Sequence, residues 1–270
     1  MSRFTFEKNV VVITGASAGI GRELAFKLAE NGAYLVLAAR NLKKLQEVVK
    51  ICRKLGGKAI AVKTHVSEKM QCKRLIGKAV RQFKRIDILI NNAGLTMSAM
   101  FADIKKIEIL EKVMKVNYFG SMYCTHFALP YLKKSKGRIV GVSSYTGKTG
   151  VPTRTGYAAS KHAMAGFFDS LRIELKKTGI SVSMIYPGFV ATGMRERALD
   201  KNGKPMKKSH IDESLAMSVE ECSEMILEAV AKRKRELVMT AKGKFGLWMK
   251  LIAPALVDRT ATKSIETGRT

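Results

Sequence analysis

The chain has 270 residues, of which 46% are hydrophobic and 26% are charged. This length and composition allow one large α/β domain or two small ones, and they exclude a disordered chain, a collagen-like repeat and a disulfide-built miniprotein. The charge is unusual, because 49 Lys and Arg against 22 Asp and Glu give +27, which attracts nucleic acid, anionic lipid and phosphorylated ligands alike.

Short apolar runs alternate with longer helical patterns over the first 190 residues. Val, Ile and Leu fill the short runs almost without interruption, which is typical of parallel strands buried on both faces. Strands are predicted at 10–14, 34–39, 59–63, 86–90, 138–142, 181–186 and 237–240. Helices are predicted, from apolar spacings of three and four, at 19–31, 41–55, 67–84, 104–134, 156–178 and 219–232. The alternation predicts an α/β fold, a doubly wound parallel sheet of the Rossmann-like kind.

The regular alternation ends after the sixth predicted strand. Residues 189–217 mix glycine and proline with methionine and basic residues, and an apolar tail after residue 240 is interrupted by Lys250 and Pro254. We therefore predict a single domain over residues 1–270 with a variable C-terminal substrate lobe. Its parts are expected to be a core at 5–240, a substrate loop at 189–217 and a C-terminal extension at 241–270.

Cysteine and histidine are too dispersed to indicate a metal site. The four residues of each type show no metal-ligand spacing, so we expect reduced, mostly buried thiols and no metal. No apolar run reaches the roughly 18 residues that would span a bilayer, and the first residues lack the apolar core of a signal peptide. These features predict a cytoplasmic protein.

A glycine-rich turn joins the first predicted strand to the first helix. Gly15 permits the tight turn, while Gly19 and Gly21 let a ligand approach the backbone and let the helix pack closely. The helix N-terminus then offers N–H groups and a positive dipole end to a pyrophosphate. Glycines alone can be plain turn residues, but here a strand and a helix flank them, so we expect dinucleotide binding that includes Ser17 and Ile20.

The end of the second predicted strand indicates which dinucleotide binds. An acidic residue there would hold a free ribose 2′-OH, but the chain has Ala39 followed by Arg40. The guanidinium of Arg40 suits the 2′-phosphate of NADP, so we predict NADP(H) rather than NAD. The alternative is that Arg40 only begins a solvated basic helix with Lys43 and Lys44.

Three side chains in the second half of the chain suggest acid–base chemistry. Tyr157 and Lys161 lie four residues apart, on one face of a predicted helix. A phenol with a pKa near 10 is a poor base, but a neighbouring ammonium and an oxidised nicotinamide ring both favour the phenolate. Ser144 follows a buried strand, where its hydroxyl can point into the cleft at the carboxyl end of the sheet.

With these residues together, the sequence resembles the short-chain dehydrogenase/reductase family. The matching motifs, in family order over about residues 5–195, are Thr14-Gly-x-x-x-Gly-x-Gly21, Asn91-Asn-Ala-Gly94, Asn117, Ser144, Tyr157-x-x-x-Lys161 and Pro187-Gly188. The resemblance implies an enzyme that interconverts a carbonyl and a secondary alcohol by hydride transfer.

The resemblance also implies a role for each residue of the catalytic group. Tyr157 would be the general acid/base, and Lys161 would bind the nicotinamide ribose and lower the pKa of the tyrosine. Ser144 would donate a hydrogen bond to the substrate oxygen, with Ser143 as the less suitable candidate. Asn117 would help to hold a water of the proton relay.

Cofactor contacts are implied beyond the glycine turn. Asn91 and Gly94 would lie on the adenine–ribose side, and Thr192 would contact the nicotinamide carboxamide. The remaining implied contacts are Ala93, Pro187 and Gly188. One departure is His65-Val66, which stands where family members often have Asp-Val, so the contact with the adenine amino group is altered.

The substrate must be inferred from variable segments. Methionine is flexible and fills irregular gaps, so a Met-rich set indicates an adaptable apolar cavity for a bulky lipid-, steroid- or acyl-like compound. The alternative is that these residues are plain core or lid packing. The set is Leu95, Met97, Met100, Val151, Phe189, Met194, Leu199, Met206, Leu215 and Met217.

Partners beyond the substrate are suggested by the tail and by the charge. The tail resembles that of a subgroup acting on lipid-like molecules. It could contact an anionic membrane as an interfacial segment, cover the cavity, or join a subunit contact. The family resemblance implies a homodimer or homotetramer through the helices at 104–134 and 156–178. The alternative function is a basic nucleic-acid- or membrane-binding protein with a non-catalytic dinucleotide fold. Nucleic acid is the less favoured partner, because the charge is spread widely and no recognition module accompanies it.

Overall fold

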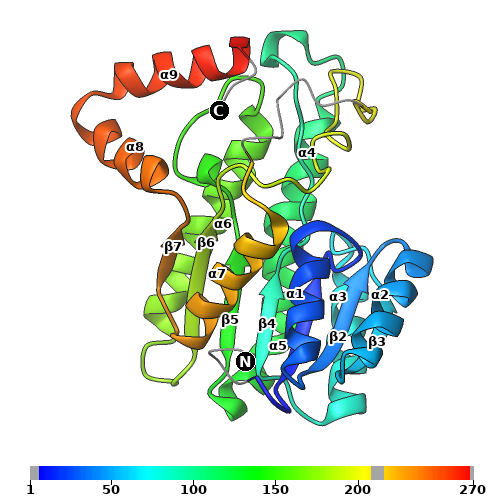
Figure 1. Ribbon diagram of the computed structural model, residues 1–270. Helices are drawn as coiled ribbons and strands as arrows, with labels where there is room; N and C mark the ends of the chain where they lie inside the picture. The colour runs from blue at the N-terminus through cyan, green and yellow to red at the C-terminus, as the bar shows by residue number, and fades with distance from the viewer. Residues whose placement is uncertain (1–5, 208–215, 268–270) are drawn as a thin grey trace.

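A computed structural model describes residues 6–207 and 216–267. One parallel sheet forms the centre of this part of the chain, with the strand order β3-β2-β1-β4-β5-β6-β7 (Figure 1). The order reverses between β1 and β4, which creates the switch point at which doubly wound sheets bind ligands. The predicted fold class is confirmed. The strands are β1 (Val10–Thr14), β2 (Tyr34–Ala39), β3 (Lys58–Lys63), β4 (Ile88–Asn91), β5 (Arg138–Val142), β6 (Ser181–Tyr186) and β7 (Glu236–Val238).

Helices cover both faces of the sheet (Figure 1). The helices are α1 (Gly19–Glu30), α2 (Leu42–Lys54), α3 (Lys69–Phe83), α4 (Glu108–Met114), α5 (Gly120–Ser135), α6 (Thr155–Glu174), α7 (Val219–Ala231), α8 (Ala241–Ile252) and α9 (Pro254–Thr267). Two short 3-10 turns are η1 (Phe101–Asp103) and η3 (Tyr145–Gly147). Successive strand residues point to opposite faces, so Val11 and Ile13 pack with α1, α2 and α7, while Val12 packs with α3, α5 and α6.

The helix predicted at 104–134 differs from the structure. It begins at Glu108 with α4 and passes through a π-helical turn, η2 (Lys115–Phe119), before α5 continues to Ser135. A π turn inserts extra backbone into a helix and frequently marks a functional site. Apolar periodicity does not reveal such an insertion, because the side chains on both sides keep their helical spacing. The turn places Asn117 in the interior, where it is fully buried.

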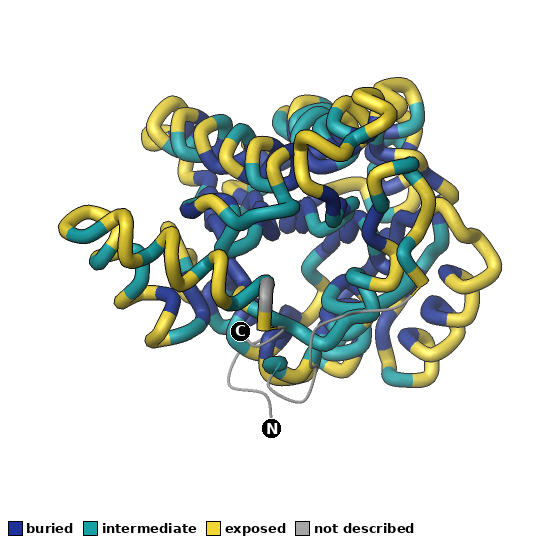
Figure 2. The backbone as a smooth tube through the Cα atoms, turned by 90° about the horizontal axis from the view of Figure 1, so that it is seen from above, coloured by how far each residue is buried: buried dark blue, intermediate teal, exposed yellow. Residues whose placement is uncertain are grey.

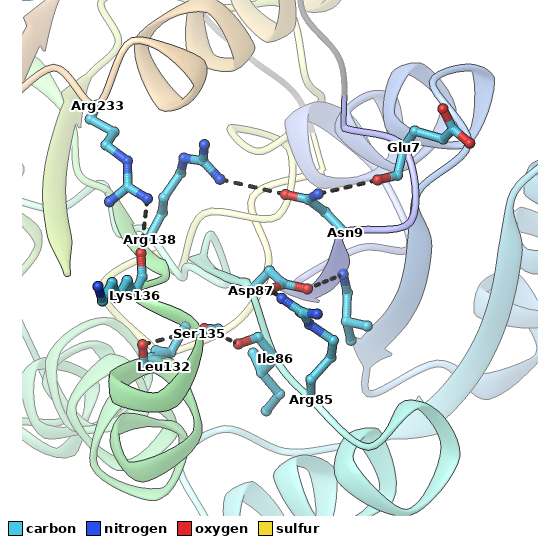
Figure 3. Close-up of polar contacts among 11 residues, drawn as sticks. Glu7, Asn9, Arg85, Ile86, Asp87, Leu132, Ser135, Lys136, Arg138 and Arg233 are labelled. Atoms are coloured by element: carbon cyan, nitrogen blue, oxygen red, sulfur yellow. Dashed lines mark hydrogen bonds and ion pairs between the residues drawn. The ribbon is translucent and has the colours of Figure 1, made fainter. Parts of the chain in front are cut away.

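A polar network ties the amino ends of the strands together, at the edge of the sheet away from the switch point (Figure 3). Asp87 precedes β4, and its carboxylate accepts hydrogen bonds from the backbone N–H of Val10 at 2.9 Å and from Arg85 at 2.6 Å. Arg233 donates to the carbonyl oxygens of Lys136 at 2.8 Å and Gly179 at 3.0 Å. These contacts fix the loops on the structural edge and leave the carboxyl edge open for ligands.

The tail forms two helices that project from the domain. The Thr240 hydroxyl caps α8 by accepting from the N–H of Gly243 at 3.0 Å, and Pro254 begins α9, at a position where proline fits a helix. Helix α9 packs chiefly on α8, and most of its residues are exposed (Figure 2). Trp248 is 57% exposed and Leu251 is 83% exposed. None of the described helices combines the length and the hydrophobicity required for a bilayer crossing.

Candidate active site

A cavity of about 2620 Å³ opens at the carboxyl ends of the strands. Its walls come from the turn after β1, the ends of β2, β4 and β5, the segment after β6, and helices α8 and α9. Pockets for one small ligand occupy roughly 300–1,000 Å³. The cavity is therefore large enough for a dinucleotide and a second molecule together.

The glycine turn after β1 is tight and passes close to the segment after β4. Gly15 has φ +69°, in the left-handed region, and a Cβ there would come within 2.8 Å of the Ala93 Cα. Ser17, Gly19 and Ile20 line the cavity at the start of α1, and their contact with a dinucleotide stays a prediction. Gly21 does not line it, since a Cβ at this position would meet the Gly15 carbonyl oxygen at 2.5 Å. Gly21 thus serves the close packing of turn against helix.

The end of the cavity at β2 is basic. Arg40 follows β2, is exposed, and lines the cavity together with Asn41 and Lys44. The Asn41 side chain caps α2 by accepting from the N–H of Lys44 at 3.0 Å, which fixes the path of the chain after Arg40. His65 also lines the cavity, at the end of β3, and its backbone N–H donates to the side chain of Gln71 at 2.9 Å. The residues present here fit a ligand with an additional phosphate.

The two adjacent asparagines at the end of β4 point their side chains in opposite directions. Asn91 is buried away from the cavity and donates to the Thr125 hydroxyl at 3.1 Å. Asn92 lines the cavity instead, and its amide donates to the carbonyl oxygens of Thr14 at 3.0 Å and Gly15 at 3.3 Å. The structure therefore does not bring Asn91 to the cavity, contrary to the expected contact. The period of two along a strand explains this alternation. Ala93 and Gly94 line the cavity as expected.

Ser144, Tyr157 and Lys161 come together in the cavity wall. Ser144 follows β5 and is hydrogen-bonded to Tyr157, which lies one turn before Lys161 on α6. The Lys161 ammonium is buried and donates to the carbonyl oxygen of Val142 at 2.8 Å. Its Nζ lies 5.8 Å from the centroid of the Tyr157 ring. The three groups expected to carry the chemistry are thus adjacent.

The protonation of this group is set by burial and by nearby charge. Burial raises the pKa of Tyr157, while the hydrogen bond from Ser144 and the charges of Arg154 and Arg195 lower it. Burial lowers the pKa of Lys161 to about 8. Among the described residues, the two arginines are therefore the cations that favour the phenolate. The expected effect of Lys161 on the tyrosine stays a prediction.

The sequence interpretation missed the two arginines, because it treated the basic residues as a solvated surface. Arg154 stands three residues before Tyr157, and its Nη1 donates to the Thr96 hydroxyl at 3.1 Å and to the carbonyl oxygen of Met97. The guanidinium carbon of Arg195 lies 3.4 Å from the centroid of the Phe189 ring. The spacing of Arg154 from Tyr157, equivalent to one helical turn, was a usable signal for the first of them.

Asn117 lies behind the cavity wall and does not line it. Its side-chain oxygen accepts from the N–H of Leu95 at 2.8 Å, and its amide donates to the Leu95 carbonyl at 2.9 Å and to the Ser160 hydroxyl at 2.8 Å. The π turn thereby holds the segment after β4 against α6. This places a rigid support beside Tyr157, and a part for Asn117 in proton transfer stays a prediction.

The segment after β6 closes the other side of the cavity. Pro187, Gly188 and Thr192 line it as expected, and a Cβ on Gly19 would lie 3.1 Å from the Thr192 Cβ. Thr192 is thus seated against the glycine turn.

The predicted substrate residues divide into two groups. Five of them line the cavity, namely Leu95, Val151, Phe189, Met194 and Met217. Met97 and Leu199 pack in a buried cluster instead, and Met100 and Met206 do not line the cavity. Leu215 lies outside the described residues. The alternative interpretation, plain packing, describes Met97 and Leu199, whereas Met100 is 54% exposed.

Within residues 6–207 and 216–267, no three His, Cys, Asp or Glu side chains gather as metal ligands. Described groups in the lining that could hold a ligand include the glycine turn, the basic end at β2 and the cavity wall around Tyr157. All four cysteines are buried, as expected.

Comparison with known proteins agrees with this geometry. The family model for short chain dehydrogenases matches residues 9–203. An 11-beta-hydroxysteroid dehydrogenase-like protein (4A) of Arabidopsis thaliana is 37% identical, with 92% of this chain and 82% of the relative covered. A dehydrogenase/reductase SDR family protein 7-like of Dictyostelium discoideum is 34% identical, with 94% and 81% covered. A solved structure of a candidate short-chain alcohol dehydrogenase from Sinorhizobium meliloti superposes with a TM-score of 0.67 at 31% identity, covering 71% of this chain and 76% of that one.

Proposed function

Because the chain belongs to the short-chain dehydrogenase/reductase family, we propose that this oxidoreductase interconverts a carbonyl and a secondary alcohol with NADP(H), Tyr157 acting as general acid/base. The observation that carries the proposal is the meeting of Ser144, Tyr157 and Lys161 in one wall of a cavity that also contains the glycine turn. This group combines a hydroxyl donor, a phenol and a buried cation.

The residues of this wall divide the work of the reaction. The glycine turn would hold the nicotinamide cofactor together with Lys161, Pro187, Gly188 and Thr192, and the bound cofactor would supply or accept the hydride. Tyr157 gives its proton to the substrate oxygen during reduction and takes it back during oxidation. The Ser144 hydroxyl donates to the same oxygen, which stabilises the charge that develops on it.

Two further residues support the catalytic group. Lys161 would hold the cofactor ribose and would act as a proton donor on the Tyr157 side of the wall, and its burial, which lowers its pKa to about 8, suits that role near neutral pH. Asn117 fixes Leu95 and Ser160 in place, so that the support behind Tyr157 keeps its geometry, and it helps to hold the water of the relay.

We infer NADP(H) rather than NAD from the end of β2. Arg40 lines the cavity beside Lys44, so two cations are available to a 2′-phosphate. An Arg40→Asp variant should weaken NADPH binding far more than NADH binding, because a carboxylate repels the phosphate and accepts from a free 2′-OH. Fluorescence titration with both cofactors measures this, and equal losses would show that Arg40 does not contact the 2′-phosphate.

We infer a bulky apolar substrate, lipid-, steroid- or acyl-like, from the lining of the remaining space. Leu95, Val151, Phe189, Met194 and Met217 supply it, and α8 and α9 extend it. Helix α8 can sit close because Gly246 lacks a Cβ, which would meet the Tyr145 hydroxyl at 2.5 Å. Relatives with steroid dehydrogenase-like names support the same class.

A single substitution tests the catalytic assignment. Tyr157→Phe should abolish turnover and leave cofactor affinity nearly unchanged, since only the phenolic oxygen is removed. Tyr186→Phe is the matched control, because Tyr186 is buried in β6 and does not line the cavity. NADPH oxidation with a panel of ketones of graded length and polarity gives the measurement. Full activity of Tyr157→Phe would refute the assignment.

We also infer a cytoplasmic homodimer or homotetramer that contacts anionic membranes through α8. Phe245, Trp248 and Leu251 are exposed on α8 beside Lys244 and Lys250, a combination suited to an anionic lipid surface. Sedimentation with anionic vesicles should deplete the wild type from the supernatant but should not deplete a Trp248→Ser, Leu251→Ser variant.

Light scattering tests the oligomer, which would pair the exposed side of α4, η2 and α6 near Tyr118 and Phe167. We do not favour nucleic acid as a partner. Elution from heparin resin at low salt, measured in a salt series, would agree with this.

A further inference from the structure

A cation lies in the cavity wall beside the reactive phenol. Arg154 immediately precedes α6 and lines the cavity. Its Nη1 donates to the Thr96 hydroxyl and to the carbonyl oxygen of Met97, both in the segment after β4. These bonds hold the guanidinium in the wall, although an arginine side chain is long enough to reach solvent elsewhere. Its charge is close enough to the Tyr157 oxygen to lower the pKa of that phenol.

The charge of Arg154 has no carboxylate partner among the described residues, and the acidic group with which it interacts is the Tyr157 phenol. Its bonds go to a hydroxyl and a carbonyl, and it takes part in none of the ion pairs of residues 6–207 and 216–267. Nε and Nη2 have no hydrogen-bond partner in this part of the chain. Burial lowers the pKa of the guanidinium, which expresses the cost of removing its charge from water. A charge in such a place is stabilised when an anion binds to it.

The surroundings strengthen the positive field at this end of the cavity. Arg195 lies on the Phe189 ring in the same lining and also lowers the pKa of Tyr157. The acidic residues of the lining are exposed, and two of them belong to α4, a helix that also carries Lys112 into the lining. The acidic lining residues are Glu68, Glu108 and Glu111.

We propose that the substrate carries an anionic group, a carboxylate or a group of similar charge, which binds Arg154 while its carbonyl or hydroxyl oxygen meets Ser144 and Tyr157. This inference rests on the proposed function and makes its substrate class more specific. The planar guanidinium fork matches a carboxylate and can hold it with two hydrogen bonds. The apolar lining, which includes Val151 and Met194, takes the rest of the molecule. The substrate is therefore an amphiphilic oxo acid or hydroxy acid, with the anionic group near the reacting carbon rather than at the far end.

Two simpler roles for Arg154 make different predictions. A tether that only fixes Thr96 and Met97 would affect acidic and neutral substrates equally. A cation that only tunes Tyr157 would also affect both, through the shared phenol. A binding site for an anion changes the ratio between the two kinds of substrate, and this ratio is the diagnostic quantity.

The experiment uses decanoic-chain oxo acids with the ketone β, γ or δ to the carboxylate, their methyl esters, and neutral ketones of similar length. NADPH oxidation gives kcat/KM for the wild type, Arg154→Gln and Arg154→Lys. Lys112→Gln removes an exposed cation from the same lining and is the matched control. Calorimetry with decanoate and with methyl decanoate gives a binding measurement that is independent of turnover.

The wild type should prefer an acid over its ester, and Arg154→Gln should lower this preference by about 10-fold, as expected for a half-buried charge pair. Arg154→Lys should keep part of it, and Lys112→Gln should keep nearly all of it. Decanoate affinity should fall in Arg154→Gln while methyl decanoate affinity does not. The anion site is refuted if the wild type reduces ketones and esters but shows no preference for the acid over its ester. It is also refuted if that preference is unchanged in Arg154→Gln. In both cases the proposed function still stands. Failure to reduce any of the three compound classes counts against both.

Discussion

Lys161 is expected to cost stability, and the cost can be measured by removing the charge. Burial lowers the pKa of its ammonium from 10.5 to about 8. Each pKa unit corresponds to about 1.4 kcal/mol, so the buried charge costs about 3 kcal/mol below pH 8, where both folded and unfolded chains hold the proton. The hydrogen bond to the Val142 carbonyl returns about 1 kcal/mol. Lys161→Met, which keeps the chain length and the burial, should therefore stabilise the folded protein at pH 7 by about 2 kcal/mol.

The free energy of unfolding of the wild type should rise with pH above pH 8. Between pH 8 and 10.5 the unfolded chain keeps the proton of Lys161 while the folded chain has released it, so the stability of the wild type rises with pH in this window. The rise from this group is about 2 kcal/mol between pH 7 and 9.5. Lys161→Met lacks it, so its advantage over the wild type should nearly vanish at pH 9.5.

Urea unfolding of both proteins without cofactor, followed by circular dichroism at pH 7 and pH 9.5, measures the two differences. Other titrating groups are common to both proteins and cancel in the comparison. Lys73→Met, an exposed site on α3, is the control and should show a difference from the wild type that does not change with pH. A variant less stable than the wild type at pH 7, or a difference that does not shrink at pH 9.5, would refute the reasoning. Loss of activity with a gain in stability would mark Lys161 as retained for function.

Two substitutions test the parts that position the site. Gly15→Ala should lower the cofactor affinity in a fluorescence titration and should reduce the free energy of unfolding by about 1–3 kcal/mol, because Gly15 has a φ of +69° and a Cβ there would meet the Ala93 Cα at 2.8 Å. The control is Gly166→Ala on α6, where a Cβ has open space, and it should be neutral or stabilising. Asp87→Ala should destabilise the protein by about 1–3 kcal/mol, because the buried N–H of Val10 loses its acceptor, and urea unfolding with unchanged cofactor affinity would show that the effect stays at the structural edge.

The sheet was predictable because burial on both faces leaves a strong signal. The strands at 10–14, 34–39, 138–142 and 181–186 have the same bounds in the structure as in the prediction. Their apolar runs have turn residues at both ends, so little else could compete. The strand predicted at 86–90 begins at Ile88 instead, since Asp87 accepts hydrogen bonds from Val10 and Arg85 before the ladder starts.

The sequence predicted which residues line the cavity where a motif offers a single candidate. It predicted this less well where a motif offers two adjacent candidates. Gly15, Ser144, Tyr157 and Lys161 reach the cavity as the motif order predicts. The pair at 91–92 shows the limit, because a motif gives two adjacent asparagines but only the strand register decides which one faces the cavity. That register depends on pairing with β1 and β5, which no local pattern contains.

Charge was the least readable property of the sequence. A net charge of +27 spread over most helices gives no reason to single out Arg154 among 49 basic residues. What distinguishes it is context: its hydrogen bonds reach Thr96 and Met97, some sixty residues earlier in the chain, and they keep a cation beside Tyr157. The same side chain in water would be ordinary surface. The selectivity that we propose therefore depends on contacts between segments distant in sequence, whereas the chemistry that we propose depends on a tyrosine and a lysine one helical turn apart.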